Sequence, residues 1–125
     1  MNNEACVLHL SGPRHVTIIF SDIKIAICTS DSREGTQEFL TKLSLDSMVD
    51  LVLCGDDKDS ISKPNPHNAL FICDKLGVSP QQTIMVGDTP ADTIMGQQAS
   101  LGLTVGVLSG DTHSIQGVSL SYIRN

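Results

Sequence analysis

The chain has 125 residues, of which 40% are hydrophobic and 18% charged, a composition typical of a single globular domain. Its formal net charge is -6, and no run of lysines or arginines is long enough to follow a nucleic-acid backbone. No apolar run approaches the roughly 18 residues of a membrane-spanning helix. The sequence therefore predicts a soluble protein that binds neither nucleic acid nor membrane. Its N-terminus, MNNEAC, carries an acid and not the basic residues of a leader peptide, which favours a cytoplasmic location.

The four cysteines are too far apart to form a CxxC pair, and three of them end apolar runs. They are Cys6, Cys28, Cys54 and Cys73. We interpret them as reduced residues of the core. Disulfide bonds in a secreted chain are the alternative.

The first half of the chain predicts two strands and a helix. Residues 1–22 hold two short apolar runs, CVLHL and VTIIF, which are consistent with a hairpin. The β-branched run Ile23–Cys28 predicts a buried strand. Asp31 and Glu34 have the spacing of a capping box, which predicts a helix after that strand. Its apolar face would contain Phe39, Leu40 and Leu43. Met48–Cys54 predicts a second strand.

The second half continues the alternation. Lys63 opens the segment KPNP, which favours an extended entry to a helix that stops at Gly77. The apolar stripe of that helix would comprise Ala69, Leu70, Cys73 and Leu76. Thr83–Val86 predicts a third strand, after which Thr89 can cap a helix that begins at Pro90. The buried face of this helix would contain Ala91, Ile94, Met95 and Ala99. Leu103–Val107 predicts a fourth strand, and Val118–Ile123 is a possible last one.

Alternating strands and helices predict an α/β fold, a doubly wound (Rossmann-like) parallel sheet in three α/β/α layers that we expect to be incomplete. We divide the chain into a divergent N-terminal segment at residues 1–22, a core at 23–110 and a tail at 111–125. Ligands of such sheets bind beyond the carboxyl ends of the strands. The polar residues expected at or near those ends are Thr29, Ser30, Asp31, Asp56, Asp57, Lys63, Asp88 and Asp92.

The segment GDTPAD at residues 87–92 places two carboxylates near one strand exit. Asp88 follows the strand directly, and Asp92 falls in the first turn of the next helix. Mg²⁺ prefers oxygen ligands and keeps several waters, so one or two carboxylates and a substrate phosphate can hold it. The alternative is that Asp92 only caps its helix.

Two further positions favour phosphate binding. Thr29 and Ser30 lie between a strand and a helix, where a hydroxyl and backbone N–H groups can hold phosphate oxygens. The same residues are also common there for structural reasons. Lys63 precedes a proline-stiffened turn, which suits a fixed positive charge over a phosphoryl group, although a surface lysine is the alternative.

A resemblance to the haloacid dehalogenase superfamily, close to its phosphoglycolate-phosphatase-like branch, covers about residues 23–110. It is carried by KIAICTSDSRE, SKPNPHNALFICDKLGV and TIMVGDTPADTIMGQQASLGLTVGVLSG. The resemblance implies a Mg²⁺-dependent phosphatase that acts on a small phosphorylated metabolite or binds inorganic phosphate.

The resemblance also implies roles for individual residues. Thr29 would supply the phosphate-binding hydroxyl, and Ser30 would add a backbone N–H. Lys63 would neutralise charge on the phosphoryl group and on the nucleophile. Asp88 would bind Mg²⁺ directly, and Asp92 would bind it or orient a coordinated water.

The chain departs from the family at the first motif. Family members present a nucleophilic aspartate in a DxDxT or DxDxS motif, and neither motif occurs in this sequence. Asp22 is the only candidate nucleophile by position. We therefore expect a truncated or alternatively started form with weak or no turnover. The missing strand belongs between those that carry Thr29 and Asp88, so we expect CVLHL, VTIIF or a second chain to fill that position.

Two other functions stay open. One is a non-catalytic module that regulates or pairs with a full-length relative, or with itself, through exposed sheet edges. The other is a receiver-like phospho-acceptor domain, which also uses Asp, Thr and Lys around Mg²⁺ but in a different order along the chain.

Overall fold

A computed structural model describes residues 4–8, 23–107 and 120–123 of the chain. The strands are β1 (Glu4–Leu8), β2 (Ile23–Cys28), β3 (Leu51–Leu53), β4 (Thr83–Gly87), β5 (Leu103–Val107) and β6 (Leu120–Ile123). They form one sheet in the order β3-β2-β1-β4-β5-β6. The five strands β1 to β5 are all parallel to their neighbours in this order, and β6 pairs with β5 in the antiparallel direction at the edge. The predicted doubly wound parallel sheet is confirmed, with this antiparallel strand as an addition.

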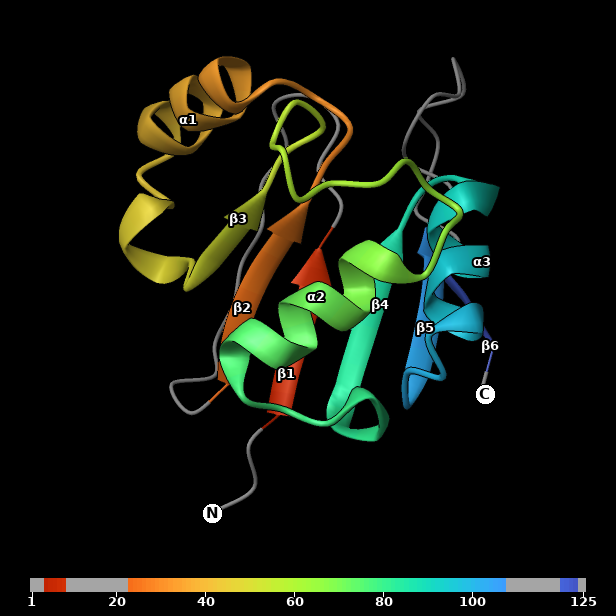
Figure 1. Ribbon diagram of the computed structural model, residues 1–125. Helices are drawn as coiled ribbons and strands as arrows, with labels where there is room; N and C mark the ends of the chain where they lie inside the picture. Colours follow the sequence, from red (N-terminus) through yellow and green to blue (C-terminus); the bar gives the residue numbers. More distant parts are fainter. Residues whose placement is uncertain (1–3, 9–22, 108–119, 124–125) are drawn as a thin grey trace.

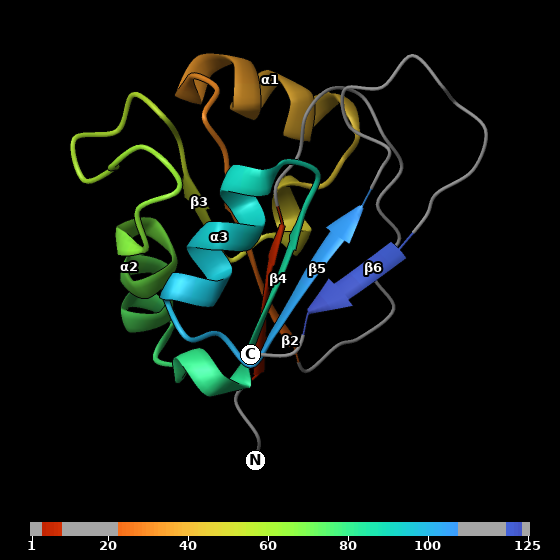
Figure 2. The same ribbon diagram turned by 90° about the vertical axis from the view of Figure 1, so that its right-hand side faces the viewer.

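The helices are α1 (Arg33–Lys42), α2 (His67–Leu76) and α3 (Pro90–Gln98), and short 3₁₀ turns lie at Asp46–Met48 and Pro80–Gln82. Figures 1 and 2 show α2 and α3 on the same face of the sheet. Ala26 and Cys28 of β2 belong to the core cluster that α2 and α3 complete. Ile27 instead shares a pocket with Phe39 of α1. Because successive strand residues point to opposite faces, α1 lies on the face opposite α2.

The strand β1 occupies the centre of the sheet. It pairs in parallel with β2 on one side and with β4 on the other, so that Leu8 lies level with Ile27 and Val86. Residues 6–8 of the run CVLHL therefore lie in the central strand, which confirms one of the expected ways to fill this position. The rest of that run and VTIIF lie outside the described residues. Filling this position gives β2 and β4 a hydrogen-bonded neighbour where a gap would have left two strand edges.

The residues that begin and end some elements differ from the prediction. Ser32, and not Asp31, caps α1, and its Oγ accepts a hydrogen bond from the N–H of Gly35. The main chain of Asp31 instead bonds within the loop, since its N–H donates to Thr29 Oγ1 and its carbonyl accepts from Gly55. The strand predicted at Met48–Cys54 is shorter in the structure, where β3 covers only Leu51–Leu53. Met48 belongs instead to the 3₁₀ turn Asp46–Met48.

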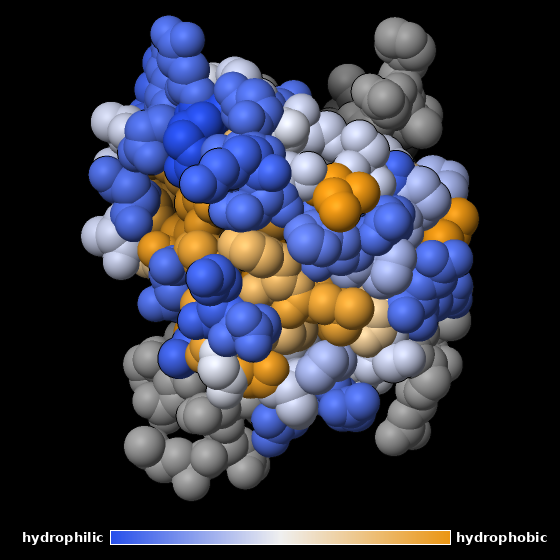
Figure 3. All heavy atoms as spheres, in the orientation of Figure 1, coloured by the Kyte–Doolittle hydropathy of each residue, from blue (hydrophilic) through white to orange (hydrophobic). Residues whose placement is uncertain are grey.

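Two predicted core residues are exposed. Leu70 of α2 is 42% exposed and Ile94 of α3 is 38% exposed, whereas Ile72 and Met95 on the same helices are buried. The buried faces predicted from apolar spacing for α2 and α3 were therefore partly wrong, since Leu70 and Ile94 do not face the core. Figure 3 shows apolar side chains among hydrophilic ones on the face of the molecule seen in Figure 1.

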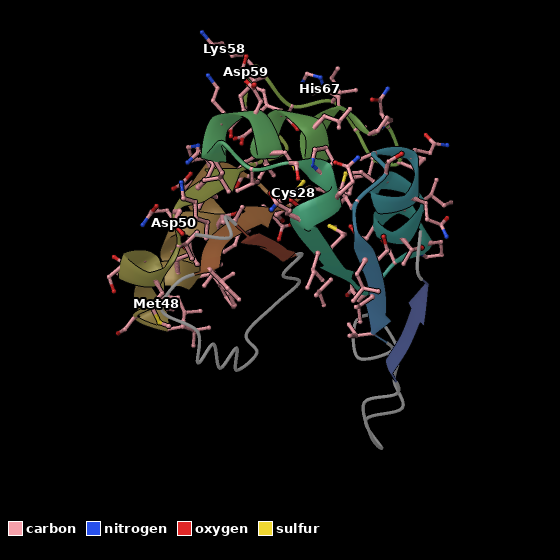
Figure 4. The ribbon with its side chains drawn as sticks, turned by 90° about the horizontal axis from the view of Figure 1, so that it is seen from below. Cys28, Met48, Asp50, Lys58, Asp59 and His67 are labelled. Carbon is pink, nitrogen blue, oxygen red and sulfur yellow. The ribbon has the colours of Figure 1, made fainter. Side chains whose placement is uncertain are left out.

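The described cysteines confirm the interpretation as reduced core residues. Cys28, Cys54 and Cys73 are free and buried, and Cys28 lies in the interior near α2 (Figure 4). Burial raises the pKa of each of these three thiols, which keeps them protonated at neutral pH. Among the described residues, no helix is long and apolar enough to cross a membrane.

Arg33 ties the start of α1 to the loop after β3. Its Nε and Nη2 atoms donate to the carboxylate of Asp57 at 2.8 and 2.6 Å, and Nη2 also donates to the carbonyl of Val52 at 2.8 Å. The backbone N–H of Arg33 donates to Asp56 at 2.8 Å. Asp56 and Asp57, which the sequence placed at a strand end, therefore hold α1 against the β3 loop.

This contact predicts a pH-dependent contribution to stability. The Arg33 hydrogen bonds, and to a smaller extent the N–H of Cys54, hold the pKa of Asp57 below its ordinary value. The native state then binds fewer protons than the unfolded state near that value, so the stabilisation is complete above about pH 4 and is lost as the pH falls. Asp57→Asn is expected to lower the free energy of unfolding by about 1 kcal/mol at pH 7, with a smaller difference near pH 3. Urea unfolding at both pH values measures this, and an equal difference at the two would contradict it.

Candidate functional site

The predicted site residues come from three loops at the carboxyl edge of the sheet. Thr29 follows β2, and Asp88 follows β4. Asp92 lies in the first turn of α3, and Lys63 lies in the loop between β3 and α2. Figure 1 shows this loop running across the top of the sheet from β3 toward α3. The fold therefore carries these residues to one edge from distant parts of the sequence.

Lys63 links two of these loops. Its Nζ donates to the carbonyl of Cys28 at 3.1 Å and to Oδ1 of Asp92 at 2.7 Å. The side chains of Lys63 and Asp92 are 6% and 0% exposed. Cys28 immediately precedes Thr29, so the ammonium lies between the end of β2 and the start of α3. Because the Lys63 side chain is buried, the alternative of a surface lysine is wrong. The peptide bond from Lys63 to Pro64 is cis.

Asp92 caps its helix and pairs with Lys63 at the same time. Its Oδ2 accepts from the backbone N–H of Thr89 at 3.2 Å and from the Thr89 hydroxyl at 2.8 Å, while its own N–H donates to Thr89 Oγ1 at 3.4 Å. Its Oδ1 faces Lys63. The sequence marked Thr89 only as a cap, but the Thr-x-x-Asp spacing was the available signal for this contact.

Two glycines keep the loops in place, and the sequence did not mark either as a site residue. A Cβ on Gly87 would lie 2.2 Å from Cβ of Asp92. A Cβ on Gly55 would lie 2.2 Å from the carbonyl oxygen of Ser30. Real Cβ atoms do not approach other atoms this closely, so a side chain at either position would displace a site loop.

Thr29 and Ser30 present different groups at the edge. Thr29 is 3% exposed, and its N–H donates to the carbonyl of Leu53 at 3.0 Å. Its Oγ1 accepts from the N–H of Asp31 at 3.1 Å, and a hydroxyl that accepts one bond can donate its hydrogen to another group. Ser30 is exposed. This loop can therefore offer a hydroxyl donor next to the exposed residue Ser30.

The first turn of α2 fixes the loop that carries Lys63. Asn68 is 3% exposed, and its Oδ1 accepts from the N–H of Ile61 at 2.9 Å while its Nδ2 donates to Ser60 Oγ at 3.1 Å. Nε2 of His67 lies 2.8 Å from the carbonyl of Asp59, and Figure 4 shows these two residues on the outer side of α2. Sequence reasoning missed Asn68, because nothing in the chain pattern links it to a loop several residues upstream.

The carboxylates fit a hard cation in part. Among residues 4–8, 23–107 and 120–123, no three His, Cys, Asp or Glu side chains gather into a metal-binding cluster. A Mg²⁺ site here would therefore rely on few carboxylates, with water and phosphate as further ligands, which is common for this ion. Asp88 is half-buried with a buried Oδ1 and has the right chemistry. Both oxygens of Asp92 already accept hydrogen bonds from the protein.

The candidate nucleophile Asp22 lies outside the described residues. Its neighbour Ile23 begins β2, and Thr29 follows the opposite end of that strand. Five residue steps of about 3.3 Å separate Ile23 from Cys28. The assignment of Asp22 as a nucleophile stays a prediction.

A family comparison agrees with this geometry. Residues 18–105 match the haloacid dehalogenase-like hydrolase family. The chain belongs to that family. The match covers the loops of Thr29, Lys63, Asp88 and Asp92 and confirms the resemblance that their motifs carried.

Individual relatives of this haloacid dehalogenase-like chain are phosphatases by name. It is 34% identical over 82 residues to the pyrophosphatase PpaX of Halalkalibacterium halodurans, which covers 66% of this chain and 38% of the relative. It is 32% identical over 85 residues to a phosphoglycolate phosphatase of Haemophilus influenzae, with the same coverage of 66% and 38%. The chain thus spans less than two fifths of the length of these relatives.

A solved structure shows the same fold. The predicted phosphoglycolate phosphatase of Haemophilus somnus 129pt superposes with a TM-score of 0.66 and 28% identity. The superposition covers 71% of this chain and 39% of the other. The haloacid dehalogenase-like α/β core is therefore present here within a shorter chain.

The buried ion pair predicts a large effect of one substitution. Asp92→Ala removes the carboxylate that lies 2.7 Å from the buried Lys63 ammonium and also removes the cap of α3, so it is expected to lower the free energy of unfolding by about 3–5 kcal/mol. Urea unfolding measures this. Asp74→Ala, an exposed carboxylate on α2, is the control and should change stability by less than about 0.5 kcal/mol. A loss below about 1 kcal/mol for Asp92→Ala would contradict a buried, paired charge.

Proposed function

We propose that the carboxyl edge of this sheet binds a phosphate group together with Mg²⁺, and that the chain as given hydrolyses phosphomonoesters weakly or not at all. The ligand would be a small phosphorylated metabolite or inorganic phosphate, in the cytoplasm. The observation that carries the proposal is the position of Lys63 Nζ, 3.1 Å from the carbonyl before Thr29 and 2.7 Å from Asp92.

Charge balance supports a role for the metal. Lys63 and Asp92 form a neutral pair, so the lysine by itself gives little net attraction for a phosphate dianion. Asp88 adds a negative charge at the same edge. A divalent cation held by Asp88 would reverse this sign and, when bound, would supply the positive field that phosphate oxygens need. Asp92 then acts by fixing Lys63, and its direct binding of the metal is the alternative.

The remaining groups can orient the phosphate. The Thr29 hydroxyl can donate a hydrogen bond to a phosphate oxygen, and the backbone N–H of the exposed residue Ser30 would be a second donor. Lys63 would neutralise part of the phosphoryl charge from its fixed position. These roles need no group beyond this chain and the ion.

The position of β1 supports the absence of turnover. Because β1 pairs with both β2 and β4, another strand bearing a DxD motif cannot enter between them. The sequence that follows Leu8 reads HLSGP and contains no carboxylate. Enzymes lower the barrier of phosphomonoester hydrolysis by up to more than about 20 kcal/mol, and covalent attack with proton transfer is a large part of this.

A regulatory or pairing module is the second candidate. The observation in its favour is that β3 ends the sheet, with β2 as its only partner strand among the described residues, and an edge strand can pair with another chain. Size-exclusion chromatography with and without a full-length relative tests this function.

Binding of inorganic phosphate should depend on Mg²⁺ and on Asp88. Isothermal titration calorimetry of the full chain is expected to detect phosphate with Mg²⁺ present, and at least about 10-fold weaker binding with EDTA or in Asp88→Asn. Asp74→Asn serves as the control with the same charge change at an exposed site of α2 and should bind like the unmodified chain. Equal affinity with and without Mg²⁺ would refute the charge argument.

Turnover of p-nitrophenyl phosphate should be close to background in the same preparation. If hydrolysis is seen, and Asp88→Asn abolishes it while Asp22→Asn does not, then a missing covalent nucleophile is not the limiting factor. That result would overturn this part of the proposal while leaving phosphate binding intact.

Introducing a DxD pair after β1 should create activity. The double substitution His9→Asp and Ser11→Asp places aspartates at the first and third positions that follow β1 in the sequence. We expect a rise in Mg²⁺-dependent turnover of about 100-fold over the unmodified chain, since nucleophile and acid–base groups contribute on this scale. The single substitution Ser11→Asp is the control and should stay near background. A folded double variant that binds phosphate without turnover would refute the explanation.

A further inference from the structure

A pocket of about 370 Å³ opens between β2 and α1. Its walls include Ile27, Thr29, Asp31, Ser32, Thr36 and Phe39. Thr29 therefore lines this pocket and is also the proposed donor to phosphate. A group esterified to a phosphate held at Thr29 could extend into this space, on the face of the sheet opposite α2.

Part of the pocket wall is apolar. Ile27 is 1% exposed and Phe39 is half-buried, so they provide an apolar surface for a short carbon chain. Two polar lining groups already bond within α1, because Ser32 Oγ accepts from Gly35 and the Thr36 hydroxyl donates to the carbonyl of Ser32. These groups are therefore partly committed to the helix.

The charge of the lining is negative. Asp31 is exposed and is the only ionisable side chain among the described residues that line the pocket. The nearby cation Arg33 is bound to Asp57, and Lys63 is bound to Asp92. A second anionic group on the ligand would therefore meet a like charge and no lysine or arginine within this lining. An ammonium group would meet an opposite charge.

We propose, on the basis of the phosphate-binding function above, that this site selects phosphomonoesters of short amino alcohols over those that carry a carboxylate or a second phosphate. The selection comes from Asp31 at the pocket and from the apolar wall of Ile27 and Phe39. It differs from the names of the relatives, which refer to phosphoglycolate and to pyrophosphate.

Calorimetric titration of the full chain in Mg²⁺ tests this with three ligands: inorganic phosphate, O-phosphoethanolamine and 2-phosphoglycolate. We expect O-phosphoethanolamine to bind about five-fold or more tightly than 2-phosphoglycolate. Asp31→Lys should reverse this order. Glu34→Lys makes the same charge change at an exposed position outside the pocket lining and should leave the order unchanged.

The outcomes separate the two proposals. If inorganic phosphate does not bind in Mg²⁺, the phosphate-binding function fails, and this inference fails with it. If inorganic phosphate binds but the two esters bind equally, or phosphoglycolate binds more tightly, only the ligand class is wrong. An equal reversal by Glu34→Lys would assign the preference to the net charge of the chain and would also overturn the role of the pocket.

Discussion

The buried contact between Lys63 and Asp92 is the interaction on which the candidate site depends. It joins the loop before α2 to the first turn of α3, and a second bond from the same ammonium reaches the end of β2. Neither side chain has appreciable exposure, so each charge requires the other to remain in the interior. This charge pair and the bond to the Cys28 carbonyl thus hold three loops near one another. The hydroxyl of Thr89 donates a hydrogen bond to this carboxylate, and Gly87, which has no side chain, leaves the space that Asp92 occupies.

The placement of β1 is the second constraint. A parallel sheet with a vacant centre would expose two strand edges, and Glu4–Leu8 removes both by pairing with β2 and β4. In the sequence, His9 and Leu10 follow this central strand. The sheet does not need an aspartate after β1, because strands pair through backbone groups and not through the side chain that follows the strand.

Local patterns sufficed where the element is also local. The strands at Ile23–Cys28 and Leu103–Val107 and the start of α3 at Pro90 were predicted from apolar runs and capping residues. The cap of α1 was misplaced by one residue, because Asp31 and Ser32 both suit that position and only the contact with Gly55 distinguishes them. The position of β1 depends on pairing with strands far along the chain. The same holds for Asn68, whose partners lie in a loop, and for Gly87, whose role appears only once Asp92 packs against it.

Retention of these contacts does not by itself imply catalysis. The Lys63–Asp92 pair, the Thr89 cap and the Asn68 bonds all contribute to folding, since each satisfies a buried polar group. A substitution at any of them would reduce stability whether or not a phosphoryl group is transferred. An aspartate nucleophile or acid–base residue after β1 is not needed to stabilise this sheet, because β1 pairs with β2 and β4 without one. The contacts around Lys63 and Asp92 would therefore be maintained by selection for stability alone, whereas an aspartate after β1 would be maintained only by selection for catalysis.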